Sequence, residues 1–188
     1  HVLRYQRHGE PASLWLSDKA VLDGSKPIRG GIPLCWPWFG PAPARVGSGK
    51  PAHGFARTSL WTLDGVSDHG DGTLVHLSLR DTAASRALWP HAFELELDVL
   101  VGKELSLVLT TRNTGKTPLT YNAALHTYLQ ISAPEAVSVT GLGEPYADKL
   151  TGQDGQQQGA LTLIAAIDRV YHQAGAMVMV KDGDRTTK

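Results

Sequence analysis

The sequence has a single cysteine, no surplus of either charge and no long apolar run. Because Cys35 has no partner within the chain, an internal disulfide is excluded; a reducing compartment is compatible with this, and we expect a cytoplasmic protein. Lysine plus arginine and aspartate plus glutamate number 18 each, so the formal net charge is zero and we expect neither a nucleic acid nor a membrane as a partner. No apolar run approaches the roughly 20 residues of a membrane-spanning helix.

What is present fits one ordinary domain. The 188 residues are 41% hydrophobic and 19% charged, which suffices for a sizeable core. We expect a single domain across residues 1–188, truncated at both ends. The sequence starts at His1 without a methionine, and it stops just after Asp182-Gly183-Asp184-Arg185, which has the composition of a turn with no partner strand after it.

Alternation of polar and apolar residues is the dominant local pattern. It runs over Glu94–Val99 and Glu104–Leu109, which predicts two strands with one face in a core and the other in water. Gly102-Lys103 between them predicts a tight hairpin with the glycine at a position of positive φ. The other expected strands are Ser13–Leu16, Thr73–Leu79, Leu119–Leu125, Ala136–Val139, Ala160–Ile164 and Ala176–Lys181.

Helix is almost absent from the pattern. Asp81–Trp89 suits a short helix, capped by Asp81 and stopped by Pro90. The glycine-rich stretch Gly152–Gly159 is interpreted as a surface loop. Many short strands separated by close turns predict an all-β protein, an antiparallel sandwich or barrel.

The most unusual segment is Pro27–Pro41, which concentrates glycine, proline and aromatic residues where no regular strand could run. Trp36 and Trp38 have two interpretations: core residues of a rigid loop, or flat rings on which the C–H face of a sugar stacks. Arg29 lies beside two glycines, which let backbone approach a ligand closely, so it is either half of a surface ion pair or an anion clamp.

Three further segments carry side chains able to do chemistry. A loop after residue 50 carries His53 and Arg57, His126 interrupts a strand of core composition, and Asp168 directly precedes Arg169. Taken singly, the pattern around His126 favours a hydrogen-bonded core histidine over a catalytic residue. The adjacent opposite charges of Asp168 and Arg169, taken singly, favour a plain ion pair.

Together these motifs resemble one family, the glucose-6-phosphate 1-epimerases (D-hexose-6-phosphate mutarotases), which are relatives of the aldose 1-epimerases. The motifs occur in the order and approximate spacing of that family: Arg29-Gly-Gly-Ile-Pro, Cys35-Trp-Pro-Trp-Phe-Gly-Pro, His53-Gly-Phe-Ala-Arg57, Leu125-His-Thr-Tyr128 and Asp168-Arg-Val-Tyr171. The resemblance implies an antiparallel β-sandwich of the galactose-mutarotase-like (supersandwich) type, with at most one short helix.

The resemblance also implies an isomerase that interconverts the α and β anomers of a hexose 6-phosphate such as glucose 6-phosphate. Arg29 and Arg57 would bind the 6-phosphate through charge-assisted contacts, and His126 would be the general acid at the ring oxygen. Asp168 would accept hydrogen bonds from sugar hydroxyls, and His53 would lie in the same pocket. The implied partner is a small-molecule sugar phosphate, with no metal and no organic cofactor.

The reaction itself calls for such residues. Breaking the bond between the ring oxygen and the anomeric carbon needs one group that donates a proton and another that withdraws one. A histidine titrates near neutral pH and can serve as donor and acceptor in turn. In the family the base is a glutamate on a late strand, whereas no glutamate follows Glu144 here.

This departure leaves alternatives open. A chain without the base would be a non-catalytic carbohydrate-binding or sensing sandwich. A β-sandwich hydrolase or lyase is less favoured, because no paired carboxylates occur at recognisable positions. Ala52 precedes His53, so no side-chain ligand is expected there. The sequence leaves open which hexose phosphate is preferred, whether free sugars react, the oligomeric state, and whether the protein has a further C-terminal part with the expected glutamate.

Overall fold

A computed structural model describes residues 1–187. The chain divides into two compact units, residues 1–129 and 130–188, and each is described by itself. The expectation of a single domain across residues 1–188 stays a prediction. No helix in the described part of the chain is long and apolar enough to cross a membrane.

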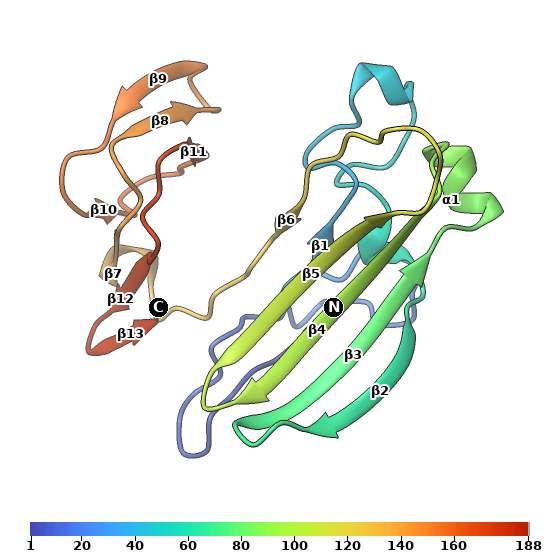
Figure 1. The fold of residues 1–188 in the computed structure, drawn as a ribbon. Coiled ribbons are helices and arrows are strands. Elements are labelled where there is room, and N and C mark those ends of the chain that lie inside the picture. The colour runs from blue at the N-terminus through green and yellow to red at the C-terminus, as the bar shows by residue number, and fades with distance from the viewer. Residues whose placement is uncertain (188) are drawn as a thin grey trace. The chain divides into compact units, whose positions relative to one another are not determined.

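A four-stranded antiparallel sheet dominates the first unit (Figure 1). Its strands, in spatial order, are β2 (Thr62–Asp68), β3 (Gly72–Arg80), β4 (Phe93–Gly102) and β5 (Leu105–Asn113). Along β4, buried and half-buried residues alternate from residue 93 to residue 100. Leu97 lies opposite Leu77 on β3 and Leu109 on β5. The period-two pattern therefore predicted β4, β5 and the core face of β4 correctly, whereas β2 was not among the expected strands.

The hairpin between β4 and β5 forms at the expected place, but its glycine has a different role. Gly102 does not have a positive φ, so that prediction was wrong. A Cβ atom added to Gly102 would lie 2.0 Å from the carbonyl oxygen of Asp71, in the turn between β2 and β3. The constraint at Gly102 is the close approach of the neighbouring hairpin, which only a residue without a side chain permits.

The single α-helix of the described residues is α1 (Ala83–Leu88), inside the expected segment. Its N-cap is Thr82 and not Asp81. The Thr82 hydroxyl accepts the N–H of Ser85 at 3.1 Å, and the Ser85 hydroxyl accepts the N–H of Thr82 at 2.8 Å. The Asp81 carboxylate instead accepts the N–H of Phe93 at 3.1 Å, which ties the start of the helix to β4.

Aromatic side chains form the centre of the core in the first unit. Trp36 is completely buried, and its ring lies 5.0 Å from that of Trp89 and 4.6 Å from that of Phe93. Trp38 is 1% exposed. Of the two interpretations of the tryptophans, packing in the core is therefore the correct one, and neither ring is available to a ligand.

Short pairings attach the loops to this core. β1 (Leu34–Cys35) pairs antiparallel with β6 (Ala124–Leu125), so only the end of the expected strand Leu119–Leu125 forms. Ser13–Leu16 contributes isolated bridges and no continuous strand. Short 3-10 helices occur at η1 (Ala44–Val46), η2 (Ala56–Thr58) and η3 (Pro134–Ala136).

The second unit contains two smaller antiparallel sheets (Figure 1), with the orders β10-β7-β12-β13 and β11-β8-β9. Their strands are β7 (Val137–Thr140), β8 (Pro145–Asp148), β9 (Gln153–Gln156), β10 (Leu161–Thr162), β11 (Arg169–Tyr171), β12 (Met179–Asp182) and β13 (Arg185–Thr187). Among the described residues of this unit, Val137 alone is buried. The unit is therefore formed mainly by strand pairing and has very little core.

Two expectations in this unit were wrong. The turn over residues 182–185 does have a partner strand after it, because β13 pairs with β12. The stretch Gly152–Gly159 is not a loop throughout, because it contains β9, which pairs with β8. Both strands are only three or four residues long, too short for an alternating pattern to stand out in the sequence.

Candidate functional site

His126 follows β6 and is placed by main-chain pairing with the glycine- and proline-rich segment. Its N–H donates to the carbonyl of Pro33 at 3.0 Å, and the N–H of Tyr128 donates to the carbonyl of Gly31 at 2.9 Å. The backbone on either side of His126 is therefore fixed while its side chain stays half-buried.

The segment that carries His53 and Arg57 is attached to the same loop through Trp36. The Trp36 carbonyl oxygen accepts the N–H groups of Phe55 and Ala56 at 3.0 and 3.2 Å. Gly54 has a φ of 67°, and a Cβ atom there would lie 2.0 Å from that oxygen. Glycine is therefore required at this position, both for its backbone conformation and for the close approach.

His53 is held by Gly40 through two hydrogen bonds. The His53 N–H donates to the Gly40 carbonyl at 2.7 Å, and the Gly40 N–H donates to Nδ1 of His53 at 3.1 Å. Because a backbone N–H can only donate, Nδ1 must be the acceptor, and the neutral ring then carries its proton on Nε2. His53 has a φ of 64°, an uncommon value for a residue with a side chain.

His53 and His126 come together although they are 73 positions apart in the sequence, as their numbers show (126 − 53). Their ring centroids are 5.9 Å apart, with the rings nearly perpendicular. The Phe39 ring lies 4.9 Å from His53 and 5.8 Å from His126, and the Tyr128 ring lies 5.0 Å from His126. We call Phe39, His53, His126 and Tyr128 the histidine cluster.

Arg57 belongs to η2, on the segment that begins with His53. One of its terminal nitrogens donates to the carbonyl of Ala52 at 3.0 Å, whereas its Nε is buried without a hydrogen-bond partner in the described chain. Its charge also reaches Cys35 on β1. Burial raises the pKa of the Cys35 thiol, and the Arg57 charge partly offsets that shift.

Arg29 lies on an exposed part of the same glycine-rich segment. Its carbonyl accepts the N–H of Ser17 at 3.1 Å, and its side chain is exposed. Gly30, next to it, forms an isolated bridge with Leu16. No salt bridge involves Arg29 within residues 1–187, so the surface ion-pair interpretation finds no support there, and the anion clamp stays a prediction.

Asp168 lies in the second unit, just before β11, with an exposed side chain. Its carbonyl accepts the N–H of Lys149 at 2.7 Å. The expected pairing of adjacent charges does not occur, because Arg169 pairs with Asp148 at 3.2 Å across the β8–β11 register. Hydrogen bonds from the Thr151 N–H, and then from Arg169, lower the pKa of Asp148.

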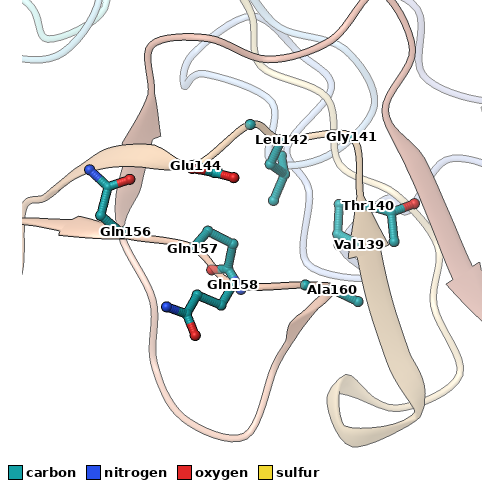
Figure 2. A pocket seen from close by; sticks show the side chains of 11 residues that line it. Val139, Thr140, Gly141, Leu142, Glu144, Gln156, Gln157, Gln158 and Ala160 are labelled. Carbon is teal, nitrogen blue, oxygen red and sulfur yellow. The ribbon is translucent and has the colours of Figure 1, made fainter.

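A cavity of about 670 Å³ also lies in the second unit, between residues 139–144 and residues 156–160. Figure 2 shows Glu144 and the three glutamines Gln156–Gln158 among its lining side chains. None of the predicted site residues lines it. The sequence signals here were Gly141-Leu142-Gly143 and the glutamine run, neither of which indicates a reaction.

The histidine cluster has the groups for moving a proton at a polar ligand, with a guanidinium on the adjoining turn. In the part of the chain that the structure describes, no three or more His, Cys, Asp or Glu side chains are grouped so that they could hold a metal ion. Phe39 and Tyr128 were not among the predicted site residues. Both belong to the motifs that carry the resemblance, but membership of a motif does not separate a site residue from a core residue.

The chain belongs to the aldose 1-epimerase family, whose sequence model matches residues 1–188. It is 37% identical over 173 residues to the "Putative glucose-6-phosphate 1-epimerase" of Escherichia coli, a match that covers 91% of this chain and 56% of the relative. It is 34% identical over 184 residues to a protein of the same name from Cenchrus ciliaris, covering 92% of this chain and 54% of the relative.

The fold has a solved counterpart. The crystal structure of a "putative mutarotase" from Salmonella typhimurium matches with a TM-score of 0.89 at 34% identity, covering 97% of this chain and 60% of that one. The mutarotase-type β-sandwich expected from the resemblance is therefore confirmed. The chain spans little more than half the length of the curated relatives it matches.

Proposed function

We propose that the protein carrying this chain interconverts the α and β anomers of a hexose 6-phosphate, with glucose 6-phosphate as the first candidate. The observation that carries the proposal is the half-buried His126 beside His53, with ring centroids 5.9 Å apart. Membership of the aldose 1-epimerase family supports the chemistry, and the names of the relatives support the substrate.

In the proposed reaction, His126 acts as the general acid. Protonated His126 gives its proton to the ring oxygen while a base removes the proton of the anomeric hydroxyl, so the bond between the ring oxygen and the anomeric carbon breaks and an aldehyde forms. After rotation about the neighbouring C–C bond, the ring oxygen attacks the other face of the aldehyde. During closure His126 takes the proton back from the attacking hydroxyl and the base returns its proton to the former carbonyl oxygen, which leaves the enzyme unchanged.

His53 has a binding role in this proposal. Its Nδ1 is occupied by the Gly40 N–H, so the neutral ring can offer a ligand only the donor Nε2–H. A donor of fixed orientation suits a hydroxyl or phosphate oxygen of the substrate. Acid–base exchange is therefore assigned to His126 and hydrogen bonding to His53.

The phosphate and the hydroxyls are assigned to the remaining residues. Arg57, whose Nε–H is a buried donor without a partner in residues 1–187, would contact the 6-phosphate together with Arg29. Charge-assisted contacts of this kind fix the sugar's position and leave the reacting atoms free to move. Asp168 would accept hydrogen bonds from sugar hydroxyls.

The test is the rate of anomer exchange. Pure α-glucose 6-phosphate would be mixed with the protein at neutral pH and followed by polarimetry, with free glucose as the parallel substrate. We expect equilibration faster than in buffer, and faster for the phosphate ester than for glucose. Exchange at the buffer rate, together with measurable binding of the sugar phosphate, would instead identify a non-catalytic carbohydrate-binding sandwich.

A further inference from the structure

Phe39 ends the aromatic run of its segment, and it differs from the tryptophans before it. Trp36 and Trp38 are 0% and 1% exposed, whereas Phe39 is 37% exposed. Packing in the core therefore does not fully account for the position of Phe39.

The Phe39 ring contacts both histidines of the cluster. It lies 5.8 Å from the His126 ring with 32° between the planes, and 4.9 Å from the His53 ring with 58° between the planes. Because His53 and His126 are themselves 5.9 Å apart, the three rings form a triangle in which each touches the other two. Tilted and edge-to-face contacts at these separations are the preferred arrangements of aromatic rings.

The backbone fixes Phe39 relative to both histidines. The Phe39 N–H donates to the side-chain oxygen of Asn122 at 2.6 Å, and Asn122 precedes the strand that leads to His126. The next residue, Gly40, exchanges two hydrogen bonds with His53. One short piece of chain is thus connected to the segments that carry both imidazoles.

We infer that Phe39 is a positioning residue: its ring holds the imidazoles of His126 and His53 in their mutual orientation. This inference rests on the proposed function for its effect on turnover, but not for its structural content. A side chain free to rotate loses the alignment that proton transfer requires, and misplacement by about 1 Å can lower a rate about 100-fold.

The test compares Phe39→Leu and Phe39→Tyr with a matched control. Tyr121→Leu is the control, because Tyr121 is 42% exposed and its ring lies 5.9 Å from Trp36 in the same unit. In Phe39→Leu we expect kcat about 10- to 100-fold lower, with KM changed much less and melting temperature nearly unchanged. Phe39→Tyr keeps the ring and should restore kcat. Tyr121→Leu should leave kcat unchanged.

A second measurement does not depend on activity. Nitrogen NMR of the histidine rings should show His53 neutral with its proton on Nε2 in the unaltered protein, and both rings restrained. In Phe39→Leu the two histidine ring signals should broaden or shift, and in Tyr121→Leu they should not. Unchanged histidine signals in Phe39→Leu overturn the inference. If wild-type protein is inactive on every sugar phosphate but the signals respond as expected, the proposed function fails and the positioning role stands.

Discussion

His126 carries the proposed acid–base step, and one substitution isolates it. His126→Asn keeps a polar side chain of similar shape, so we expect the folded state to persist. Loss of general acid catalysis should lower kcat by about 10²- to 10⁴-fold, measured by polarimetry. His69→Asn, at an exposed histidine in the turn between β2 and β3, is the control and should retain full activity. Near-normal turnover in His126→Asn would return His126 to a structural role.

Substitution of Arg57 tests whether the proposed site prefers a phosphate ester. A hydrogen bond to a charged partner contributes roughly 1.5–3 kcal/mol, so Arg57→Ala should weaken glucose 6-phosphate binding about 10- to 150-fold. Binding of free glucose should barely change. Calorimetric titration measures both ligands, and raised salt should weaken the phosphate ester more than glucose because salt screens the attraction.

The control for Arg57 is Arg80→Ala, which removes an exposed guanidinium that pairs with Glu94 on the sheet. It should alter neither affinity. If Arg57→Ala weakens glucose and glucose 6-phosphate equally, the phosphate clamp is wrong and the protein is better described as an epimerase or binder of neutral sugars.

At the scale of elements, the outer face of the four-stranded sheet carries a pH-dependent contact. His76 on β3 lies opposite Asp98 on β4, and Nδ1 of His76 contacts the Asp98 carboxylate. The hydrogen bond to Asp98 raises the pKa of His76, and the charges of Asp98, Asp64 and Glu96 add to the shift.

A raised pKa in the folded state means that the protonated form favours folding. The His76–Asp98 contact therefore contributes fully to the free energy of unfolding below the ordinary histidine pKa of about 6.5. This contribution is lost as the pH rises through the higher pKa that His76 has in the folded protein. The urea midpoint of the wild type should therefore exceed that of His76→Asn by more at pH 6 than at pH 9. Tryptophan fluorescence measures this urea midpoint, because all five tryptophans lie in the first unit, as His76 does. An equal difference at both pH values contradicts the prediction.

The strands that could be predicted are those in which packing and sequence agree. In β4 one face is buried and the other half-buried, so its residues alternate visibly. β2 is an edge strand formed by pairing with β3, and all seven of its residues are exposed. Because neither face of β2 is buried, its sequence does not alternate between polar and apolar residues, and the strand was missed. The N-cap at Thr82 was missed for a similar reason, since Asp81 and Thr82 are both good capping residues and only the fold chooses between them.

The site could be predicted only as an ordered set of motifs. His53 and His126 are far apart in the sequence, and no local pattern brings them together. Their contact depends on two tertiary features, the Trp36 carbonyl that accepts two N–H groups and the pairing of β1 with β6. Phe39 was not predicted because an aromatic residue beside two buried tryptophans gives no sign that it is exposed.

At the scale of the whole molecule, the two units differ in how much they bury. The first contains the aromatic core, whereas Val137 is the one buried residue among those described in the second. Apolar burial is the main favourable term in folding, so the second unit should open more readily. Hydrogen exchange followed by mass spectrometry should show peptides from residues 137–187 exchanging before those from β3, β4 and β5. Equal protection of both units would contradict this expectation.

The buried thiol of Cys35 offers a way to observe ligands without observing catalysis. Cys35 is the chain's one cysteine, it is 1% exposed, and its pKa is raised by burial, so a thiol reagent reaches it only when the first unit opens. A ligand that binds the closed form suppresses opening by the factor 1 + [L]/Kd, so labelling should slow about tenfold at ten times Kd. The rate of Cys35 labelling therefore reports ligand affinity, and it can be measured for inactive variants and for sugars that are never turned over.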